Sequence, residues 1–526
     1  MNCKNFSTDV VHISFRKQRI VNLFLICSFI IGVSASVRAE DSVRQVDAQN
    51  AKQLIKQAEK LSRRGETDEA EKVLRRVIEA YPQESKAKLN LAYILQKQRR
   101  LLEAYNLSFE VAKADSKNAF AFAVLGATFL NAGNFKEAKL SFLNALQLNK
   151  KEALAWAGLG TLDFYENRIF TGLENLRAAV YFEYNNPEFL FTLAQIATRA
   201  EKYTEAAAAY DRFLQVSPET DSERRDRIKG LINFLRFLGN KPSLYDLNET
   251  RQTVVSFKLR NNRPIIQLKV NDKDEPLNFV LDTGSGISVI SKETADRFNI
   301  KSISRGGLAR ALGGNGKFEI IYGFLRSVSI GDIKVRNVPV YIRSFHNKDE
   351  KIDGYIGLAL ISKFLTTIDY GNLTFALQKK VFAQNTSTES LSLPLRLTSS
   401  GFLSGEVELE GVESPLNFIV DTGASVSVIS DEIANKKEIS QFVKAEKMRV
   451  IGAAGITEDV SSFILPRVSF GTHSRERVTA IALNLDIINE ASGFVQAGIL
   501  GGNFLKNYVL TFDFENSKVI FVPVKK

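Results

Sequence analysis

One segment of the chain occurs twice, and this duplication constrains the fold more than any other feature of the sequence. The segment Phe279–Ser285 reads FVLDTGS, and 139 residues later Phe418–Ala424 reads FIVDTGA. The apolar residues before each aspartate predict a buried strand that holds the carboxylate in place. The glycine after each threonine leaves room for two backbones to pass close together. A single Asp-Thr-Gly triplet is a weak signal because turns use all three residue types, but two copies predict two related loops.

The similarity between the two copies extends well beyond the triplet. Counting from each aspartate, a glycine-rich stretch begins 31 residues later, at Gly313 and at Gly452. Further on, residues 354–369 align without a gap on residues 498–513, and both copies then end in a β-rich run. Both copies therefore have the same order of a strand, a glycine-rich hairpin and a helix that begins after a glycine. This shared order indicates a duplicated domain.

Two aspartate loops that face each other across a symmetry axis support a specific chemistry. Carboxylates about 3 Å apart cannot both ionise, so the pair shares one proton. The charged member takes a proton from a water held between them, and the protonated member polarises the carbonyl of a peptide bond. The sequence therefore favours hydrolysis of an extended peptide segment without a metal or another cofactor.

The duplicated pattern resembles the retropepsin-like aspartic peptidases, the group that contains retroviral proteases and pepsins. The resemblance covers about half of the chain. It implies two all-β, barrel-like lobes, residues 251–382 and 390–526, packed as a pseudo-dimer with the site on the pseudo-twofold axis. The second copy has Gly501-Gly-Asn503, which is closer to the family's corner sequence than the first copy's Gly357-Leu-Ala359.

The same resemblance implies roles for single residues. Asp282 and Asp421 become the catalytic pair, while Thr283 and Thr422 join the two loops by reciprocal hydrogen bonds. The other supporting positions of the two loops are Gly284, Ser285 and Gly423. Flaps that close over substrate are implied at the glycine-rich hairpins, with Gly313, Gly314, Gly316, Gly452 and Gly455.

A difference between the two loops predicts unequal roles for the two aspartates. Ser285 follows the first triplet, where its hydroxyl could donate a hydrogen bond to Asp282, whereas Ala424 follows the second triplet and offers no side-chain donor. Hydrogen bonding to a charged carboxylate favours the charged form. We therefore expect Asp282 to carry the negative charge and Asp421 to hold the shared proton. With a single such donor, activity is expected to extend toward neutral pH.

The first half of the chain shows a different repeat, with a period of 34 residues. Small residues recur at this spacing at Ala70, Ala104, Ala138, Gly172 and Ala206, and leucines recur at Leu91, Leu125, Leu159 and Leu193. This period is that of the tetratricopeptide repeat (TPR), a helix-turn-helix unit. We expect residues 48–240 to form an all-α TPR solenoid of five repeats and a capping helix, with its own core. Its concave groove is suited to a substrate or partner protein.

The N-terminus predicts export. Basic residues within Arg16–Arg19 precede an apolar run from Ile20 to Val33, and Val37-Arg-Ala39 offers small residues of the kind that a signal peptidase reads. This run suits a signal peptide better than a membrane-spanning helix, which needs about 20 residues. We therefore expect residues 1–39 to be a bacterial-type signal peptide of a periplasmic or secreted protein. The alternative is an uncleaved anchor, and membrane contact is expected only in that case.

Composition excludes several other classes of protein. Both cysteines, Cys3 and Cys27, lie within the expected leader, so the remaining chain has no thiol for disulfides, catalysis or a metal site. The three histidines are scattered at His12, His346 and His473, which leaves little material for a histidine metal site or a catalytic triad. The net charge of +11 is spread along the chain without a clustered basic and aromatic face, so nucleic-acid binding is not expected.

These observations predict an exported aspartic endopeptidase whose solenoid recruits a polypeptide substrate or a partner protein. One alternative is a noncatalytic scaffold that keeps peptidase-like lobes as a peptide clamp, although a clamp has no need of a buried carboxylate pair. Another alternative is that each lobe pairs with its copy in a second molecule, which would give symmetric sites in a dimer. The relative positions of Asp282 and Asp421 within one chain distinguish these two modes of pairing.

Overall fold

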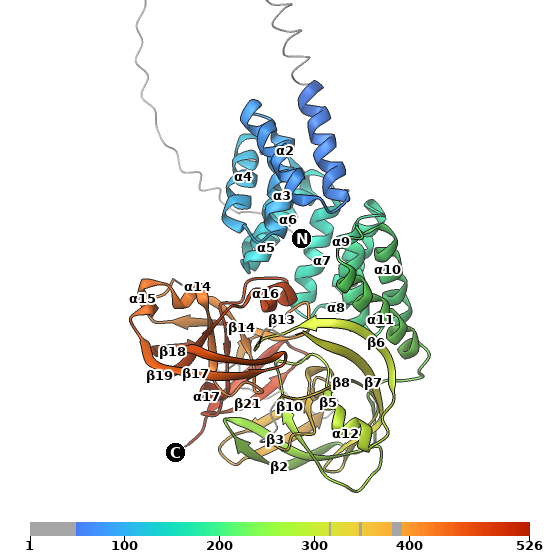
Figure 1. The fold of residues 1–526 in the computed structure, drawn as a ribbon, viewed down its shortest axis with the longest axis vertical. Helices are drawn as coiled ribbons and strands as arrows, with labels where there is room; N and C mark the ends of the chain where they lie inside the picture. The colour runs from blue at the N-terminus through green and yellow to red at the C-terminus, as the bar shows by residue number, and fades with distance from the viewer. Residues whose placement is uncertain (1–48, 315–316, 347–349, 381–391, 414, 526) are drawn as a thin grey trace, which may run out of the picture. The chain divides into compact units, whose positions relative to one another are not determined.

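The computed structural model describes residues 49–314, 317–346, 350–380, 392–413 and 415–525, and residues 54–526 form one compact unit (Figure 1). The predicted signal peptide, Gly316 of the first predicted flap and the predicted lobe boundaries at residues 382 and 390 lie outside the described residues. Among the helices of the described ranges, none is both long and apolar enough to cross a bilayer.

The first half of the chain consists of successive helices that pack in pairs, as the 34-residue period predicts. A helix at residues 49–63 is followed by α2 (Thr67–Ala80), α3 (Ser85–Lys97), α4 (Leu101–Ala114), α5 (Ala119–Ala132), α6 (Phe135–Leu148), α7 (Ala153–Tyr165), α8 (Ile169–Phe182), α9 (Pro187–Arg199), α10 (Tyr203–Val216) and α11 (Ser222–Gly239). The alanines of the repeat position are fully buried, and a Cβ atom built on Gly172 would lie 2.7 Å from the carbonyl oxygen of Gly160 on the neighbouring helix. Small residues carry the period because larger side chains would separate the paired helices.

The first β-rich lobe contains β1 to β11. Its elements are β1 (Asp246–Leu247), β2 (Gln252–Arg260), β3 (Arg263–Val270), β4 (Leu277–Leu281), β5 (Val289–Ser291), α12 (Lys292–Arg297), β6 (Ser302–Arg310), β7 (Lys317–Ile330), β8 (Ile333–Arg343), β9 (Gly354–Ile356), α13 (Leu358–Ile361), β10 (Phe364–Asp369) and β11 (Thr374–Lys379). Most neighbours are antiparallel, but β4 pairs in parallel with β9, and β5 pairs in parallel with β8. These two parallel pairs surround the first Asp-Thr-Gly loop.

The second lobe repeats this plan. Its elements are β12 (Ser392–Pro394), β13 (Arg396–Leu397), β14 (Leu403–Leu409), β15 (Leu416–Val420), β16 (Ser427–Ser430), α14 (Asp431–Ala434), α15 (Lys437–Ser440), β17 (Val443–Gly452), β18 (Gly455–Phe470), β19 (His473–Leu483), α16 (Asp486–Ser492), β20 (Gly498–Leu500), α17 (Gly502–Leu505), β21 (Tyr508–Asp513) and β22 (Lys518–Pro523). Here the parallel pairs are β15 with β20 and β16 with β19. The predicted fold class, a TPR solenoid followed by two retropepsin-like lobes, is confirmed.

The two lobes share one sheet. Strand β10 of the first lobe pairs antiparallel with β21 of the second, from Thr366 opposite Phe512 to Asp369 opposite Val509. Strands β11 and β22 extend this sheet on either side. Buried apolar side chains of both lobes also belong to one continuous core cluster. In this structure the two lobes of the pseudo-dimer therefore pair with each other within one chain, as the intramolecular mode of pairing predicts.

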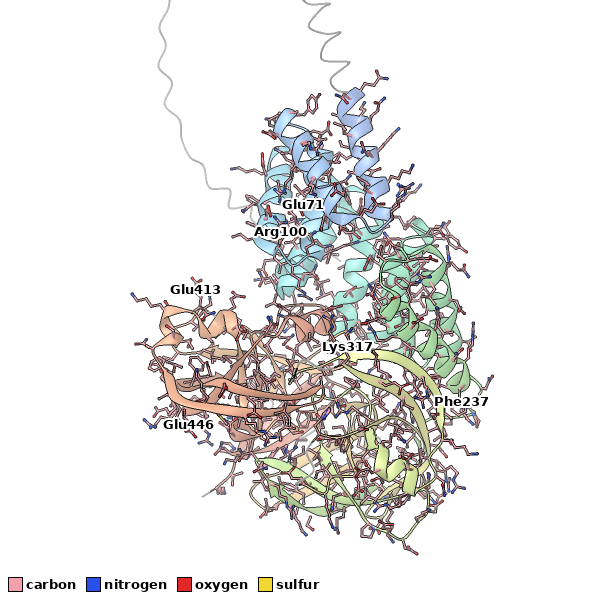
Figure 2. The ribbon with its side chains drawn as sticks, viewed as in Figure 1. Glu71, Arg100, Phe237, Lys317, Glu413 and Glu446 are labelled. Carbon is pink, nitrogen blue, oxygen red and sulfur yellow. The ribbon has the colours of Figure 1, made fainter. Side chains whose placement is uncertain are left out.

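The capping helix α11 packs on the first lobe as well as on the solenoid. The rings of Phe234 and Tyr322 stack with centroids 4.6 Å apart, and Phe237 meets Phe324 edge to face at 5.3 Å. Lys317, which begins β7 next to the tip of the first hairpin, pairs with Glu223, and Figure 2 labels Phe237 and Lys317. The capping helix therefore shares its apolar face with the first lobe, because Phe234 and Leu238 of α11 belong to the same core cluster as the β-strand residues.

Candidate active site

The two Asp-Thr-Gly loops leave the ends of buried strands and face each other. Asp282 follows β4 and donates its backbone N–H to Ile356, while Asp421 follows β15 and donates to Leu500, both at 3.0 Å. The residues before each aspartate are buried: Val280, Leu281 and Val420 are 0% exposed and Ile419 is 2% exposed. The apolar sequence before each triplet therefore fixes the start of the loop, as expected from the sequence.

The threonines join the two loops by four hydrogen bonds. Thr283 Oγ1 donates to the carbonyl oxygen of Val420 at 2.7 Å, and Thr422 Oγ1 donates to that of Leu281 at 2.7 Å. Each hydroxyl also accepts the backbone N–H of the other threonine, at 3.0 and 3.2 Å. Both side chains are fully buried, so these reciprocal bonds set the separation of the two aspartates.

The glycines of the triplets allow the carboxyls to approach each other. A Cβ atom on Gly423 would lie 2.7 Å from Cγ of Asp282, and one on Gly284 would overlap the Asp421 carboxyl. Any larger residue at these positions would push the loops apart. As a result, the Asp282 and Asp421 carboxyls of one chain face each other at close range.

The surroundings of the two aspartates favour the opposite distribution of charge and proton from the one expected from the sequence. Burial, together with the facing Asp421, holds the pKa of Asp282 well above its usual range. Burial also raises the pKa of Asp421, but backbone donors oppose this rise. Asp421 Oδ1 accepts from Gly423 at 2.7 Å and from Ala424 at 3.2 Å, whereas Asp282 Oδ1 accepts from Gly284 at 2.9 Å. The negative charge is therefore favoured on Asp421 and the shared proton on Asp282.

The predicted hydrogen bond from Ser285 to Asp282 is also wrong. The Ser285 hydroxyl donates to the carbonyl oxygen of Ile287 at 2.9 Å and so stabilises the turn after the triplet. Ala424, which has no side-chain donor, contributes its backbone N–H instead. The asymmetry of the pair thus depends on loop geometry, which the identity of these two side chains does not reveal.

The two glycine hairpins meet at their tips. The first is formed by β6 and β7 and the second by β17 and β18. A Cβ atom on Gly313 would lie 2.6 Å from Cα of Gly452, and one on Gly314 would lie 2.9 Å from Cα of Gly455. Gly314 also donates its N–H to Thr457 Oγ1 at 2.6 Å. The described flap glycines therefore form one contact between the lobes, which bridges the cleft.

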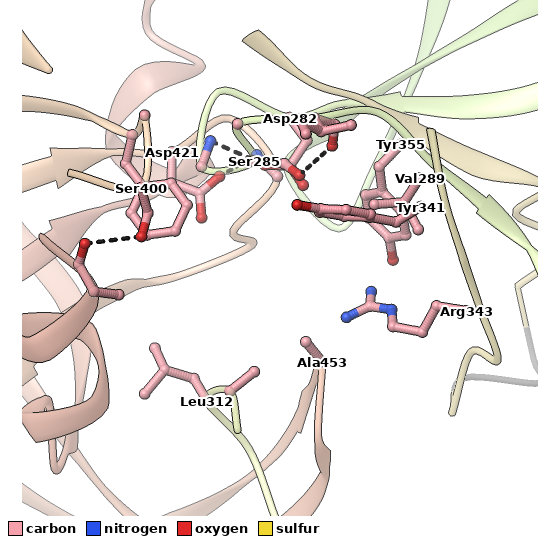
Figure 3. Close-up of a pocket in the computed structure, with 18 of the residues that line it drawn as sticks. Asp282, Ser285, Val289, Leu312, Tyr341, Arg343, Tyr355, Ser400, Asp421 and Ala453 are labelled. Atoms are coloured by element: carbon pink, nitrogen blue, oxygen red, sulfur yellow. Dashed lines mark hydrogen bonds between the residues drawn. The ribbon is translucent and has the colours of Figure 1, made fainter. Parts of the chain in front are cut away.

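A cavity of about 1230 Å³ lies between the aspartates and the hairpin tips. Figure 3 shows Asp282 and Asp421 on one side, with Leu312 and Ala453 of the two hairpins across the space. Its lining also includes Tyr341, Arg343 and Tyr355 of the first lobe, Leu483 of the second, and Gln195, Thr198 and Arg199 of α9. These lining residues were not predicted from the sequence, although the strand that ends in Tyr341-Ile-Arg343 follows the first hairpin directly. In the described part of the chain, no group of three His, Cys, Asp or Glu side chains is placed to hold a metal ion.

Comparison with known families agrees with this geometry. Residues 266–360 and residues 405–504 each match the aspartyl protease family, one segment in each lobe. Each lobe therefore contains a segment that is similar to this family. Residues 55–119 and 173–220 match the tetratricopeptide repeat family, so the helical half and the β-rich half of the chain match two different families.

Similar solved structures include TPR proteins. PilF of Pseudomonas aeruginosa is 20% identical, and the match covers 37% of this chain and 88% of that protein with a TM-score of 0.28. A thermophilic TPR protein of Thermus thermophilus is 19% identical, and the match covers 35% of this chain and 98% of that protein with a TM-score of 0.31. No curated protein sequence matches the chain.

Proposed function

We propose that the chain is an exported aspartic endopeptidase that hydrolyses peptide bonds in an extended polypeptide segment. The observation that carries the proposal is the facing Asp282 and Asp421 pair, which is half-buried and lines the cavity beneath the meeting point of two glycine hairpins. Burying two carboxyls costs free energy, and the threonine bonds hold them in place against that cost. A peptide clamp would not require such a pair.

The chemistry follows from the asymmetry of the pair. The charged Asp421 accepts a proton from a water held between the carboxyls, and that water attacks the scissile carbonyl carbon. Asp282 donates its proton to the carbonyl oxygen, which prevents the build-up of negative charge there. The tetrahedral intermediate then collapses: Asp421 gives the proton it took from water to the leaving nitrogen, the C–N bond breaks, and a hydroxyl of the intermediate returns a proton to Asp282. Neither aspartate alone can supply both a base and an acid.

In this proposal, the solenoid binds the substrate or a partner protein and brings it to the active site. Side chains of α9 line the same cavity as the aspartates, so a polypeptide held by the solenoid has a continuous path to the pair. The N-terminal basic and apolar segment supports export to a periplasmic or extracellular location. The N-terminal sequence of the protein recovered from a bacterial periplasm tests this part: cleavage after Ala39 supports it, and an intact leader opposes it.

The decisive experiment measures hydrolysis of an unfolded protein, such as reduced casein, by the full chain. Asp282→Asn and Asp421→Asn should each reduce kcat by at least about 10³-fold, because general acid and base catalysis is lost. The surface variant Asp274→Asn is the control and should retain full activity. Full activity in either single active-site variant would overturn the peptidase proposal and favour the noncatalytic scaffold.

A further inference from the structure

The cleft beside the aspartates has two walls that are related by the pseudo-twofold axis but differ in chemistry. The strand registers around β5 and β8 in the first lobe match those around β16 and β19 in the second. The registers of β4 with β9 and of β15 with β20 match in the same way. The equivalent positions, first lobe before second, are Tyr341 and Ile481, Arg343 and Leu483, and Tyr355 and Ile499.

Arg343 gives the first wall a cation that faces the cavity. It is the last residue of β8, and its guanidinium points into the space between Tyr341, Tyr355 and Ala453 (Figure 3). The guanidinium carbon lies 5.4 Å from the ring centroid of Phe318 and 5.5 Å from that of Phe345. These rings hold the side chain in place and shield it from water.

This guanidinium has unused hydrogen-bonding capacity. Its Nε atom is buried without a hydrogen-bond partner, and no ion pair joins it to a carboxylate within the described ranges. The neighbouring Glu350 is engaged elsewhere, because it pairs with Arg263 and accepts a 2.7 Å hydrogen bond from Asn261. Arginine stays charged even when it is partly buried. Arg343 is a half-buried cation whose charge acts on Asp282 and Tyr355 but which has no ion-paired carboxylate in the described ranges, so it is complementary to an anion brought in by a ligand.

The second wall is apolar. Ile481 is 5% exposed and Ile499 is 6% exposed, and both belong to a hydrophobic cluster of the second lobe. Leu483 occupies the position equivalent to Arg343, and Leu312 of the first hairpin packs against the same cluster. An aliphatic or aromatic side chain can be buried against this wall, whereas a carboxylate would be desolvated without a partner.

We propose that the cleft selects peptides with an aspartate or glutamate on one side of the scissile bond and a large apolar residue on the other. The acidic side chain is bound by Arg343, and the apolar side chain lies against Ile481, Leu483 and Ile499. The two side chains flank the scissile bond because the catalytic pair lies between the walls. This substrate class rests on the proposed peptidase function.

The first test is a randomised peptide library digested by the full chain, with the cleavage products identified by mass spectrometry. Cleaved bonds should be flanked by Asp or Glu on one side and by Leu, Ile, Phe or Met on the other. Replacing the acidic residue by its amide in a selected peptide should reduce kcat/KM by at least tenfold. Equal kcat/KM for the acid and amide peptides would overturn the inference.

Variants separate a specific role of Arg343 from a structural one. Arg343→Leu copies the residue of the equivalent wall and should abolish the preference for the acid over the amide peptide, while Arg343→Lys should retain part of it. Arg449 also lines the cavity but pairs with Glu458 at 3.0 Å. Arg449→Leu is therefore the matched control and should leave the preference unchanged. Retention of the full preference in Arg343→Leu would contradict the assignment.

A binding measurement keeps this inference independent of catalysis. Fluorescein-labelled acid and amide peptides are titrated with the Asp282→Asn chain, and the anisotropy gives a Kd for each. The acid peptide should bind at least tenfold more tightly, and Arg343→Leu in the same background should remove the difference. If the wild-type chain binds the acid peptide more tightly but hydrolyses neither peptide, only the peptidase function is contradicted. If it hydrolyses peptides but binds the acid and amide peptides equally, only the proposed substrate class is contradicted.

Discussion

At the scale of single residues, the charge state of the aspartate pair depends on backbone donors. The loop of Asp421 supplies the N–H groups of Gly423 and Ala424 to one oxygen, while the loop of Asp282 supplies that of Gly284. Additional hydrogen bonds to a carboxylate stabilise its charged form. The two carboxyls titrate as a coupled pair, so each measurable pKa describes the pair and not a single aspartate. The difference between the loops therefore decides which aspartate holds the one shared proton.

The raised pKa values predict how stability depends on pH. A carboxyl whose pKa is higher in the folded than in the unfolded state contributes stability below the unfolded pKa, and this contribution is lost as the pH rises through the folded pKa. Asp282 has such a raised pKa because it is buried and faces Asp421. Asparagine does not ionise, so Asp282→Asn removes this pH-dependent loss of stability. The substitution should therefore increase the free energy of unfolding at pH 7 by about 1.4 kcal/mol per unit of the pKa rise.

Urea unfolding at pH 4 and pH 7 checks this expectation. The gain from Asp282→Asn should be clear at pH 7 and should shrink toward pH 4, because the Asp282 carboxyl of the unfolded wild-type chain becomes protonated near that pH as well. Asp274→Asn is the control, because its side chain is fully exposed and its ion pair with Lys269 lies on the surface. An equal gain at both pH values would show that the buried carboxyl does not cause the effect.

At the scale of elements, α11 and the first hairpin form one packed unit. Ser304 Oγ of β6 donates to the carbonyl oxygen of Gly230 at 2.8 Å, and the ring of Phe234 stacks on Tyr322 of β7. Gly230 must lack a side chain, because a Cβ atom there would lie 2.5 Å from Cα of Gly306. The solenoid therefore supports the strands that carry one of the two flaps.

Phe234→Ala should affect catalysis as well as stability. Removing this buried ring leaves a cavity and should cost about 3–5 kcal/mol of unfolding free energy. It also removes support from β7, so kcat/KM for a short peptide should fall in the fraction that remains folded. Phe142→Ala is the matched control, because Phe142 is buried within the solenoid on α6. Its loss should cost similar stability and leave kcat/KM unchanged, so equal kcat/KM in both variants would oppose the coupling.

The difference between local and long-range information explains which elements the sequence could predict. The Asp-Thr-Gly loops and the paired helices follow from residues that are close in sequence, because alternating apolar runs and a fixed period are local signals. The stacking of Phe234 on Tyr322 and the pairing of β10 with β21 join residues far apart in the chain. Arg343 was missed for the same reason, since its role depends on what faces β8 across the cleft.

At the scale of the whole molecule, the site is completed within one chain. The shared strands β10 and β21, the reciprocal threonine bonds and the meeting hairpins all join the first lobe to the second. Covalent linkage gives the two lobes a high effective concentration for each other, on the order of millimolar for short linkers. Exchange of lobes between molecules at micromolar protein concentration is therefore unfavourable.

Mixing two inactive variants tests this single-chain arrangement. Equal amounts of the full-length Asp282→Asn and Asp421→Asn chains should show no more hydrolysis than either chain alone, because every molecule keeps one damaged carboxyl in its own pair. The wild-type kcat/KM should also stay constant when the enzyme concentration is varied over about 100-fold. If lobes exchanged between molecules, unmutated Asp421 of one chain would meet unmutated Asp282 of another, and the mixture would recover activity with time. Such recovery, or a specific activity that rises with enzyme concentration, would contradict the intramolecular pair and favour an active site shared between chains.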